Sequence, residues 1–351
     1  MDVDVKAARA PGRDPGLDVV RTVAIVFVLL IHTAANGLLG QPGTFEWWSA
    51  MLWGIPVRSA VPLFFMCSGA LMLCRDITPK RIFTHNMPRI LCAMFAWAFL
   101  YHFAALVDDG FTMAGLWAAV KNTVLLRHEF HFYYLHMLIL VYAFLPAARV
   151  FVRSASRREL EYLLALWFVT GILFPLLKNF WPFTLISQID TRYKMTMAYS
   201  AIGYALLGHY LRQYGHTIKR KWFALSFLGG LAFTFGGCAF FSLRNGVLSE
   251  VFLEGMSPGA MFMALGLFGL ITTQETWPAP VAKVIGRLAQ ASFCVYLVHI
   301  LFLRLFLRLG ISAGAAPCLV WIPVVSLLLL ATGWLTWEVL HRIPIVKTYL
   351  V

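Results

Sequence analysis

The fold of this chain is decided by one stretch, residues 17–36, which reads LDVVRTVAIVFVLLIHTAAN. It is long and apolar enough to form a helix that crosses a bilayer. It nevertheless contains Asp18, Arg21 and His32, and ionisable side chains are costly inside a membrane span. Arg21 and His32 are eleven residues apart, which is about 16 Å along a helix. An arginine toward one leaflet and a histidine toward the other suggest work done across the membrane.

The composition of the whole chain indicates an integral membrane protein. Of the 351 residues, 60% are hydrophobic and only 13% are charged, whereas soluble domains average about 25% charged residues. The formal net charge is +13. Because cytoplasmic loops of membrane proteins collect Lys and Arg, this charge does not indicate a nucleic-acid partner.

Several common sites and signals are not indicated. None of the six cysteines forms a C-x-x-C pair, so we expect inert thiols and no metal site. An N-terminal signal peptide is also disfavoured, because Asp18 and Arg21 fall beside its hydrophobic region.

Hydropathy predicts an all-α, polytopic transmembrane bundle of about ten spans. The predicted spans are residues 17–39, 55–74, 90–107, 131–150, 160–177, 195–211, 222–241, 256–273, 286–307 and 317–340. This divides the chain into an N-terminal tail (1–16), a transmembrane domain (17–340) and a C-terminal tail (341–351). Residues 40–53 are expected to form a loop with Trp47 and Trp48 at the interface, and residues 75–89 a basic loop.

The distribution of positive charge predicts that both termini are cytoplasmic. With that orientation, nineteen Lys and Arg residues fall in inner segments and nine in outer segments or outer span ends, as the positive-inside rule requires. Arg21 then lies in the inner half of the first span, and His32 lies toward the outer half.

His32 is the best single candidate for a catalytic group. A neutral imidazole can take a proton from a hydroxyl or water near pH 7, although a histidine hydrogen-bonded between helices is an equally simple interpretation. Arg21 remains charged and needs an anion or a water-lined cavity. A salt bridge to Asp18, three residues earlier, is the structural alternative for Arg21, and it would let Asp18 orient the guanidinium.

Two further segments place polar side chains in apolar spans. His131 and Tyr134 begin the fourth span among aromatic residues, which resembles a sugar-binding wall and equally resembles an aromatic belt. In the ninth span Ser292, Tyr296 and His299 form a polar stripe that points to the bundle interior. We interpret His131, Tyr134, Tyr296 and His299 as candidates that line an acceptor cavity.

The second span and the basic loop after it supply the remaining candidates. Ser68 belongs to a Pro-containing segment with a small Ser-Gly pair, which suggests close helix packing, and it is a further candidate for lining the cavity. Lys80, Arg81 and Arg89 fit the positive-inside rule and are also candidates to hold a phosphorylated cytoplasmic donor.

Five of these segments, in order, resemble the acyltransferase-three family of integral membrane acyltransferases, which modify bacterial surface polysaccharides. Arg21 and His32 match its Arg-x10-His signature. The other similar segments are residues 61–69, 131–146, 201–211 and 292–299. One departure is that many members have an Arg-x-x-Arg pair before the third span, and this chain has Asn86 and Arg89 there.

The resemblance implies a fold of roughly ten helices in the bacterial inner (cytoplasmic) membrane. It implies an O-acyltransferase with no permanently bound cofactor, which takes an acyl group, commonly acetyl, from acetyl-CoA. The acceptor would be a sugar hydroxyl of an exported or lipid-linked polysaccharide. His32 would be the catalytic base or acyl carrier, and Arg21 would help place the donor.

Two other classes of function remain open from the sequence alone. One is a proton-coupled transporter or flippase in which His32 and Arg21 carry protons or pass an anion. The other is a structural subunit of a complex that synthesises or exports polysaccharide, in which neither residue would matter.

Overall fold

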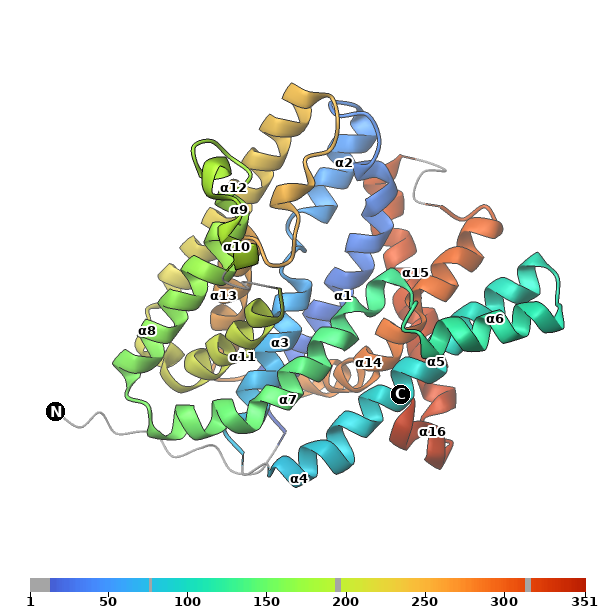
Figure 1. Cartoon of the computed structure of the whole chain (residues 1–351), viewed down its shortest axis with the longest axis horizontal. Helices are drawn as coiled ribbons and strands as arrows, with labels where there is room; N and C mark the ends of the chain where they lie inside the picture. Colours follow the sequence, from blue (N-terminus) through green and yellow to red (C-terminus); the bar gives the residue numbers. More distant parts are fainter. Residues whose placement is uncertain (1–12, 76–77, 193–196, 313–316) are drawn as a thin grey trace.

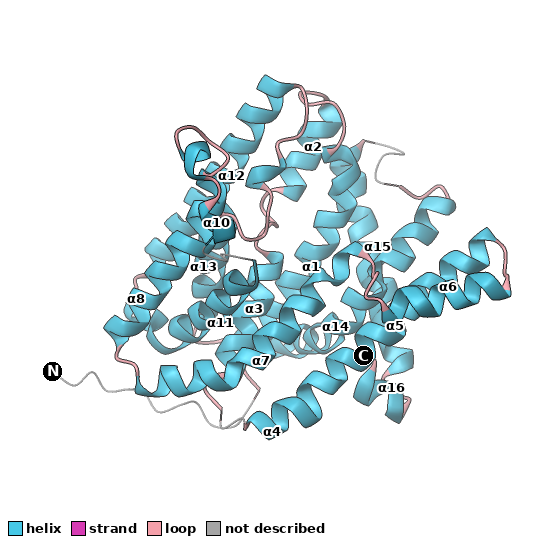
Figure 2. Cartoon of the chain, in the orientation of Figure 1, coloured by secondary structure: helices cyan, strands magenta, loops and turns pink. Residues whose placement is uncertain are grey.

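The computed structural model describes residues 13–75, 78–192, 197–312 and 317–351, and in this part of the chain every regular element is helical (Figure 2). The predicted tail at residues 1–12 lies outside the described residues. The helices are α1 (Pro15–Leu38), α2 (Phe45–Gly54), α3 (Ala60–Met72), α4 (Pro79–Arg81), α5 (Met87–Asp109), α6 (Met113–Val124), α7 (Tyr133–Ser154), α8 (Arg157–Trp167), α9 (Phe174–Leu177), α10 (Ile189–Arg192), α11 (Met197–Tyr214), α12 (Arg220–Asn245), α13 (Pro258–Thr272), α14 (Ala279–Arg308), α15 (Cys318–Leu340) and α16 (Pro344–Tyr349).

The protein is a polytopic helical membrane protein. Seven helical segments of the described chain are long and apolar enough to cross a bilayer: Pro15–Leu38, Pro79–Asp109, Phe130–Ser154, Arg157–Leu177, Arg220–Asn245, Ala279–Arg308 and Cys318–Leu340. The predicted second and eighth spans correspond to the shorter apolar helices α3 and α13, and the predicted sixth span to α11. The all-helical class is therefore confirmed, and the count of ten stays a prediction.

Helix α1 is the central element of the bundle (Figure 1). It is the most buried of the seven candidate spans and packs against α2, α3, α13, α14 and α15. Its start is defined by Asp14, whose side chain accepts hydrogen bonds from the backbone N–H groups of Gly16 (3.0 Å) and Leu17 (3.3 Å). The apolar stretch that contains Asp18, Arg21 and His32 is thus surrounded by protein, where neighbouring polar groups can bind these ionisable side chains.

Helices α3 and α11 approach each other more closely than helices with side chains at the contact could. A Cβ atom added to Gly69 would lie 1.8 Å from the carbonyl oxygen of Ala205, and one added to Gly208 would lie 2.1 Å from that of Met66. Close packing through small residues is the membrane equivalent of a tight core contact. It fixes the position of the predicted second span.

Two spans contain a π-helical segment just before a proline. Residues Ile82–Asn86 precede Pro88, and residues Phe168–Leu173 precede Pro175. Proline lacks a backbone N–H and its ring crowds the carbonyl four residues earlier. The wider π turn accommodates this without ending the helix.

Two loop predictions are wrong in detail, and the predicted C-terminal tail is partly helical. Residues 45–54 form helix α2 instead of a loop, and Trp47 is completely buried while Trp48 is exposed. The basic segment is helical from Pro79 onward. The C-terminal tail contains α16, which packs against α5. Helix α2 packs against α15 as well as α1, and α16 packs against α5, and local composition does not reveal these contacts with helices distant in sequence.

Candidate functional site

Three histidines from three different elements converge beside α1. The ring of His32 lies 5.0 Å from that of His299, between centroids, and His299 lies 5.1 Å from His131. His131 and His299 are buried, whereas His32 keeps part of its surface accessible. We call these three residues the histidine cluster. Within the described chain, no group of three His, Cys, Asp or Glu side chains is arranged as metal ligands.

The hydrogen bonding of His299 determines which of its nitrogens is protonated. Its Nδ1 lies 2.6 Å from the carbonyl oxygen of Tyr296. A carbonyl only accepts, so Nδ1–H donates and Nε2 retains a lone pair. This Nε2 and both ring nitrogens of His131 are buried without a partner among the described residues. Unpaired buried nitrogens are costly, so the cluster offers free acceptor and donor positions to a ligand.

Two tyrosines fix the backbone around the cluster. The hydroxyl of Tyr296 donates to the carbonyl oxygen of His131 at 2.5 Å, and the hydroxyl of Tyr101 donates to that of Leu297 at 2.9 Å. Both tyrosine rings also contact the ring of His131 edge-on. These bonds connect α5, the start of α7 and α14, and they hold the imidazole rings in place.

A second group of polar side chains surrounds Arg21, which lies about 16 Å from His32 along α1. Arg21 lies close enough to Tyr142 and Arg89 to interact electrostatically with both. The hydroxyl of Tyr142 is also within hydrogen-bonding reach of Ser68. We call Arg21, Ser68, Arg89 and Tyr142 the arginine cluster. Two guanidinium groups and two hydroxyls form a site suited to a polyanion.

The same helices carry both clusters. On α1 the step from Arg21 to His32 is eleven residues. The step from His131, in the 3-10 turn just before α7, to Tyr142 on α7 is also eleven residues, in the opposite direction. Eleven residues span about 16 Å of helix. Helix α5 repeats the arrangement with Arg89 near one cluster and Tyr101 near the other. Helix α7 is antiparallel to α1 and helix α5 is parallel to it. Each therefore places residues in or next to both clusters, at the same two depths as Arg21 and His32.

Tyr134 lies between the two clusters. Its ring is 5.3 Å from the ring of Tyr296, between centroids, and its phenol interacts electrostatically with Arg21. Phe64 and Phe65 of α3 enclose it. The predicted cavity residue Tyr134 thus links the arginine cluster to the residues that support the histidine cluster.

The remaining predicted residues have other neighbours. Asp18 pairs with Arg13 instead of Arg21, so the predicted salt bridge within α1 is wrong. The physical reason is that Arg13, just before the helix, also reaches the carbonyl oxygen of Gly286 on α14 and closes over Asp18. Lys80 and Arg81 are exposed on α4. Arg89 donates to the main-chain oxygen of Val351 at 2.5 Å.

A comparison with protein families adds to this geometry. A family model for an acyltransferase domain matches residues 14–338. This chain belongs to the acyltransferase-three family. A search of curated proteins and a search of solved structures each returned no match. The protein is accordingly a multi-pass membrane acyltransferase, which uses an acyl donor and an acceptor.

The sequence pattern singles out His32 and Arg21 but not two further residues that lie near the clusters, Tyr142 and Arg58. Tyr142 was not predicted. It follows His131 by eleven residues, the same separation as between Arg21 and His32, so in a helix antiparallel to α1 it lies at the level of Arg21 when His131 lies at the level of His32. Arg58 is the other. It precedes α3 and acts electrostatically on His32. In the sequence, Arg58 is an arginine at the edge of an apolar span. Because arginines are common at such edges, this position did not mark it as functional.

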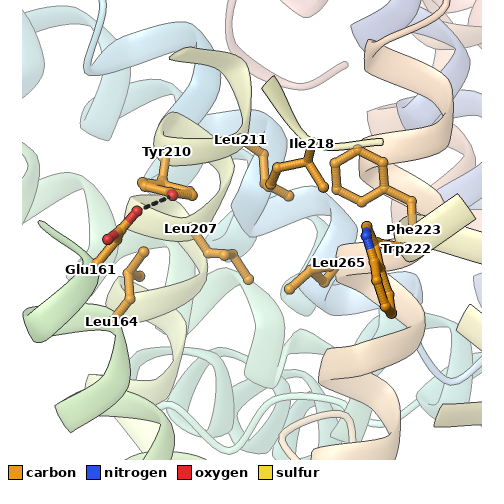
Figure 3. A pocket seen from close by; sticks show the side chains of 9 residues that line it. All are labelled: Glu161, Leu164, Leu207, Tyr210, Leu211, Ile218, Trp222, Phe223 and Leu265. Carbon is orange, nitrogen blue, oxygen red and sulfur yellow. Dashed lines mark hydrogen bonds between the residues drawn. The ribbon is translucent and has the colours of Figure 1, made fainter. Parts of the chain in front are cut away.

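Two of the cavities among the described residues differ in their relation to the clusters. One, of about 220 Å³, lies among α8, α11, α12 and α13 and has mostly apolar walls (Figure 3). Its polar groups Glu161 and Tyr210 hydrogen-bond each other at 2.5 Å. The other, of about 270 Å³, lies between α5 and α14 and is lined by Asp108, Asp109, Arg304 and Arg308. Arg304 also lies over the ring of Tyr101, so the second cavity is next to the histidine cluster.

Proposed function

We propose that this protein transfers an acyl group, acetyl in the simplest case, from cytoplasmic acyl-CoA to a sugar hydroxyl of an exported or lipid-linked polysaccharide. The observation that carries the proposal is the pairing of an arginine cluster and a histidine cluster on the same helices, about 16 Å apart along α1. Cations suit the phosphates of the donor, and an imidazole suits proton removal from an acceptor. Family membership supports the reaction class.

The transfer step uses His32 as a general base. Its imidazole takes the proton from the acceptor hydroxyl while the oxygen attacks the thioester carbonyl. The carbon–sulfur bond then breaks, the acyl group stays on the acceptor oxygen, and the thiol of CoA leaves with the proton from the imidazolium. His32 suits this role because, of the three clustered histidines, it is the one with accessible surface. Formation of a transient acyl-histidine is a variant of the same step.

The donor is held by Arg21 and Arg89, with Lys80 and Arg81 at the exposed entrance. Phosphate oxygens accept strong, charge-assisted hydrogen bonds from guanidinium groups. The pantetheine arm then extends past Tyr134, which lies between the clusters. The acceptor reaches the histidine cluster from the opposite side, by the cavity with Asp108, Asp109, Arg304 and Arg308.

This path gives the protein a direction in the bacterial inner membrane, with both termini and the arginine cluster toward the cytoplasm. The direction rests on the distribution of Lys and Arg, and α3, α11 and α13 complete the ten spans. The contacts between α1 and α14 support parallel crossing of these two helices. The Thr22 hydroxyl donates to the carbonyl of Ile285 at 3.2 Å, and farther along His32 contacts His299.

The proposal is tested by reconstituting the purified protein into liposomes with acetyl-CoA and envelope glycan. We expect free CoA to be released and acetyl ester to appear on the glycan, as detected by mass spectrometry, with both dependent on His32. Glycan movement across the bilayer without consumption of acetyl-CoA would instead indicate a transporter or flippase and would overturn the proposal.

A further inference from the structure

Arg58 is a charged residue beside the histidine cluster with little to bind in the protein. It lies in the turn between α2 and α3, partly buried. Its Nη1 donates one long hydrogen bond, 3.4 Å, to the carbonyl oxygen of Leu253, and its Nε is buried without an acceptor. No carboxylate of the described chain lies within ion-pair distance of it. A guanidinium has five N–H donors, so most of its bonding capacity is unused.

The charges near Arg58 place it at the reacting end of the site. It interacts electrostatically with His32, with the phenol of Tyr133, with Cys238 and with Glu250. Glu250 is exposed and makes no ion pair with it. Leaving a partly buried cation without a bonded anion is unfavourable, unless an anion forms there during turnover.

A second arginine near the histidine cluster differs from Arg58 in its bonding. Arg304 also acts electrostatically on the histidine cluster, through His131. Its guanidinium, however, is held in an ion pair, since it donates to both carboxylate oxygens of Glu129 at 3.0 and 2.7 Å. Of these two arginines, Arg58 is the one without a bonded carboxylate.

We infer that Arg58 is a catalytic residue that stabilises the oxyanion of the tetrahedral intermediate formed when the acceptor oxygen adds to the thioester carbonyl. This inference rests on the proposed function. When His32 removes the hydroxyl proton, the new carbon–oxygen bond moves the carbonyl electron pair onto its oxygen. The charge develops next to the base, in the neighbourhood of Arg58 and its unpaired donors. It returns to the carbonyl when the carbon–sulfur bond breaks.

Arg58 is expected to affect the reaction rate because the negative charge on the oxygen exists only during the reaction. Neither the thioester nor the hydroxyl carries a negative charge before reaction, so the interaction with Arg58 is strongest in the transition state and raises kcat. Removing one oxyanion donor from an enzyme lowers kcat about 10²–10³-fold. An arginine that bound an anionic acceptor would instead mainly change the KM for that acceptor.

The experiment compares Arg58→Gln, Arg58→Lys and, as a control at an exposed arginine near the end of α12, Arg244→Gln in the full-length protein reconstituted in liposomes. Release of CoA from acetyl-CoA is measured with water alone, with methyl glucoside as a neutral probe, and with envelope glycan. We expect Arg58→Gln to lower kcat about 10²–10³-fold for all three acceptors with the KM for acetyl-CoA little changed. Arg58→Lys should recover part of the rate, because it retains the charge, and Arg244→Gln should retain wild-type kinetics.

Two results would overturn the inference. One is wild-type kcat in Arg58→Gln. The other is a loss confined to the glycan, with hydrolysis and transfer to methyl glucoside intact, which would make Arg58 a binding site for an anionic acceptor. A wild-type protein that consumes no acetyl-CoA with any acceptor would reject the proposed function itself. Thermal unfolding of each variant separates loss of rate from loss of fold.

Discussion

The arginine cluster and the histidine cluster are built on the same helices but in different ways. The histidine cluster is rigid, since Tyr296 and Tyr101 bond main-chain carbonyls across three elements and aromatic rings surround His131. The arginine cluster combines two long cationic side chains with two hydroxyls, and one of its arginines, Arg89, bonds a main-chain oxygen just after α16. Chemistry needs fixed geometry, whereas holding a flexible polyanion needs charge. The difference agrees with the proposal that the histidine cluster carries out the transfer and the arginine cluster binds the donor.

The largest expected effect is at the histidine cluster. Replacing His32 with alanine removes the base, and we expect kcat to fall about 10²–10⁴-fold with the KM for acetyl-CoA nearly unchanged. The exposed residue His216 supplies the matched control, and His216→Ala should retain wild-type kinetics. Steady-state release of CoA measures both variants. If His32→Ala kept its kcat and lost donor affinity, the assignment of the two clusters would be reversed.

The two clusters should depend together on the position of α3. Gly69→Ala would push a methyl group into the carbonyl of Ala205 on α11, and overpacking of this kind costs about 1–3 kcal/mol or more. We expect a lower unfolding midpoint and reduced transfer. Gly229→Ala on α12 meets nothing within 4 Å and serves as the control. Equal stability of the two variants would show that the α3–α11 contact does not hold the site together.

At the arginine cluster we expect a change in binding. Arg21→Ala removes hydrogen bonds to a charged ligand, worth about 1.5–3 kcal/mol, so the KM for acetyl-CoA should rise about tenfold to a hundredfold while kcat changes less. Arg21→Lys should lie between this variant and the wild type, because it keeps the charge and loses the planar donor pair. A fall in kcat at unchanged KM would place Arg21 in the transfer step.

The smallest effects come from a matched pair of hydroxyl deletions. Tyr296→Phe removes the hydrogen bond to the carbonyl of His131, and Tyr142→Phe removes the hydroxyl next to Ser68 and Arg21. Each loss should cost about 1 kcal/mol. We expect Tyr296→Phe to lower kcat several-fold and Tyr142→Phe to raise the KM for acetyl-CoA several-fold. The same kinetic change in both variants would remove the distinction between the clusters.

The sequence was sufficient for the helical class and for the contribution of α1, because hydropathy and the charges within a span act locally. The spacing of Arg21 and His32 predicted that these two side chains lie at different depths along one helix. The convergence of His131 and His299 on His32 could not be derived from the residues alone, because it depends on how α7 and α14 pack against α1. Arg58 and the contact of Arg89 with Val351 were missed for the same reason. Asp18 was paired with the wrong arginine because only one helix was considered.

The central claim is that donor and acceptor enter from opposite faces and meet at His32. It is tested most directly in sealed liposomes that contain the protein in one orientation, with acetyl-CoA on only one side and glycan on both. The account predicts that acetyl-CoA supports transfer only from the face with Lys80 and Arg81, and that acetylated glycan appears on the opposite face. Acetylated glycan on the same side as the acetyl-CoA would contradict it.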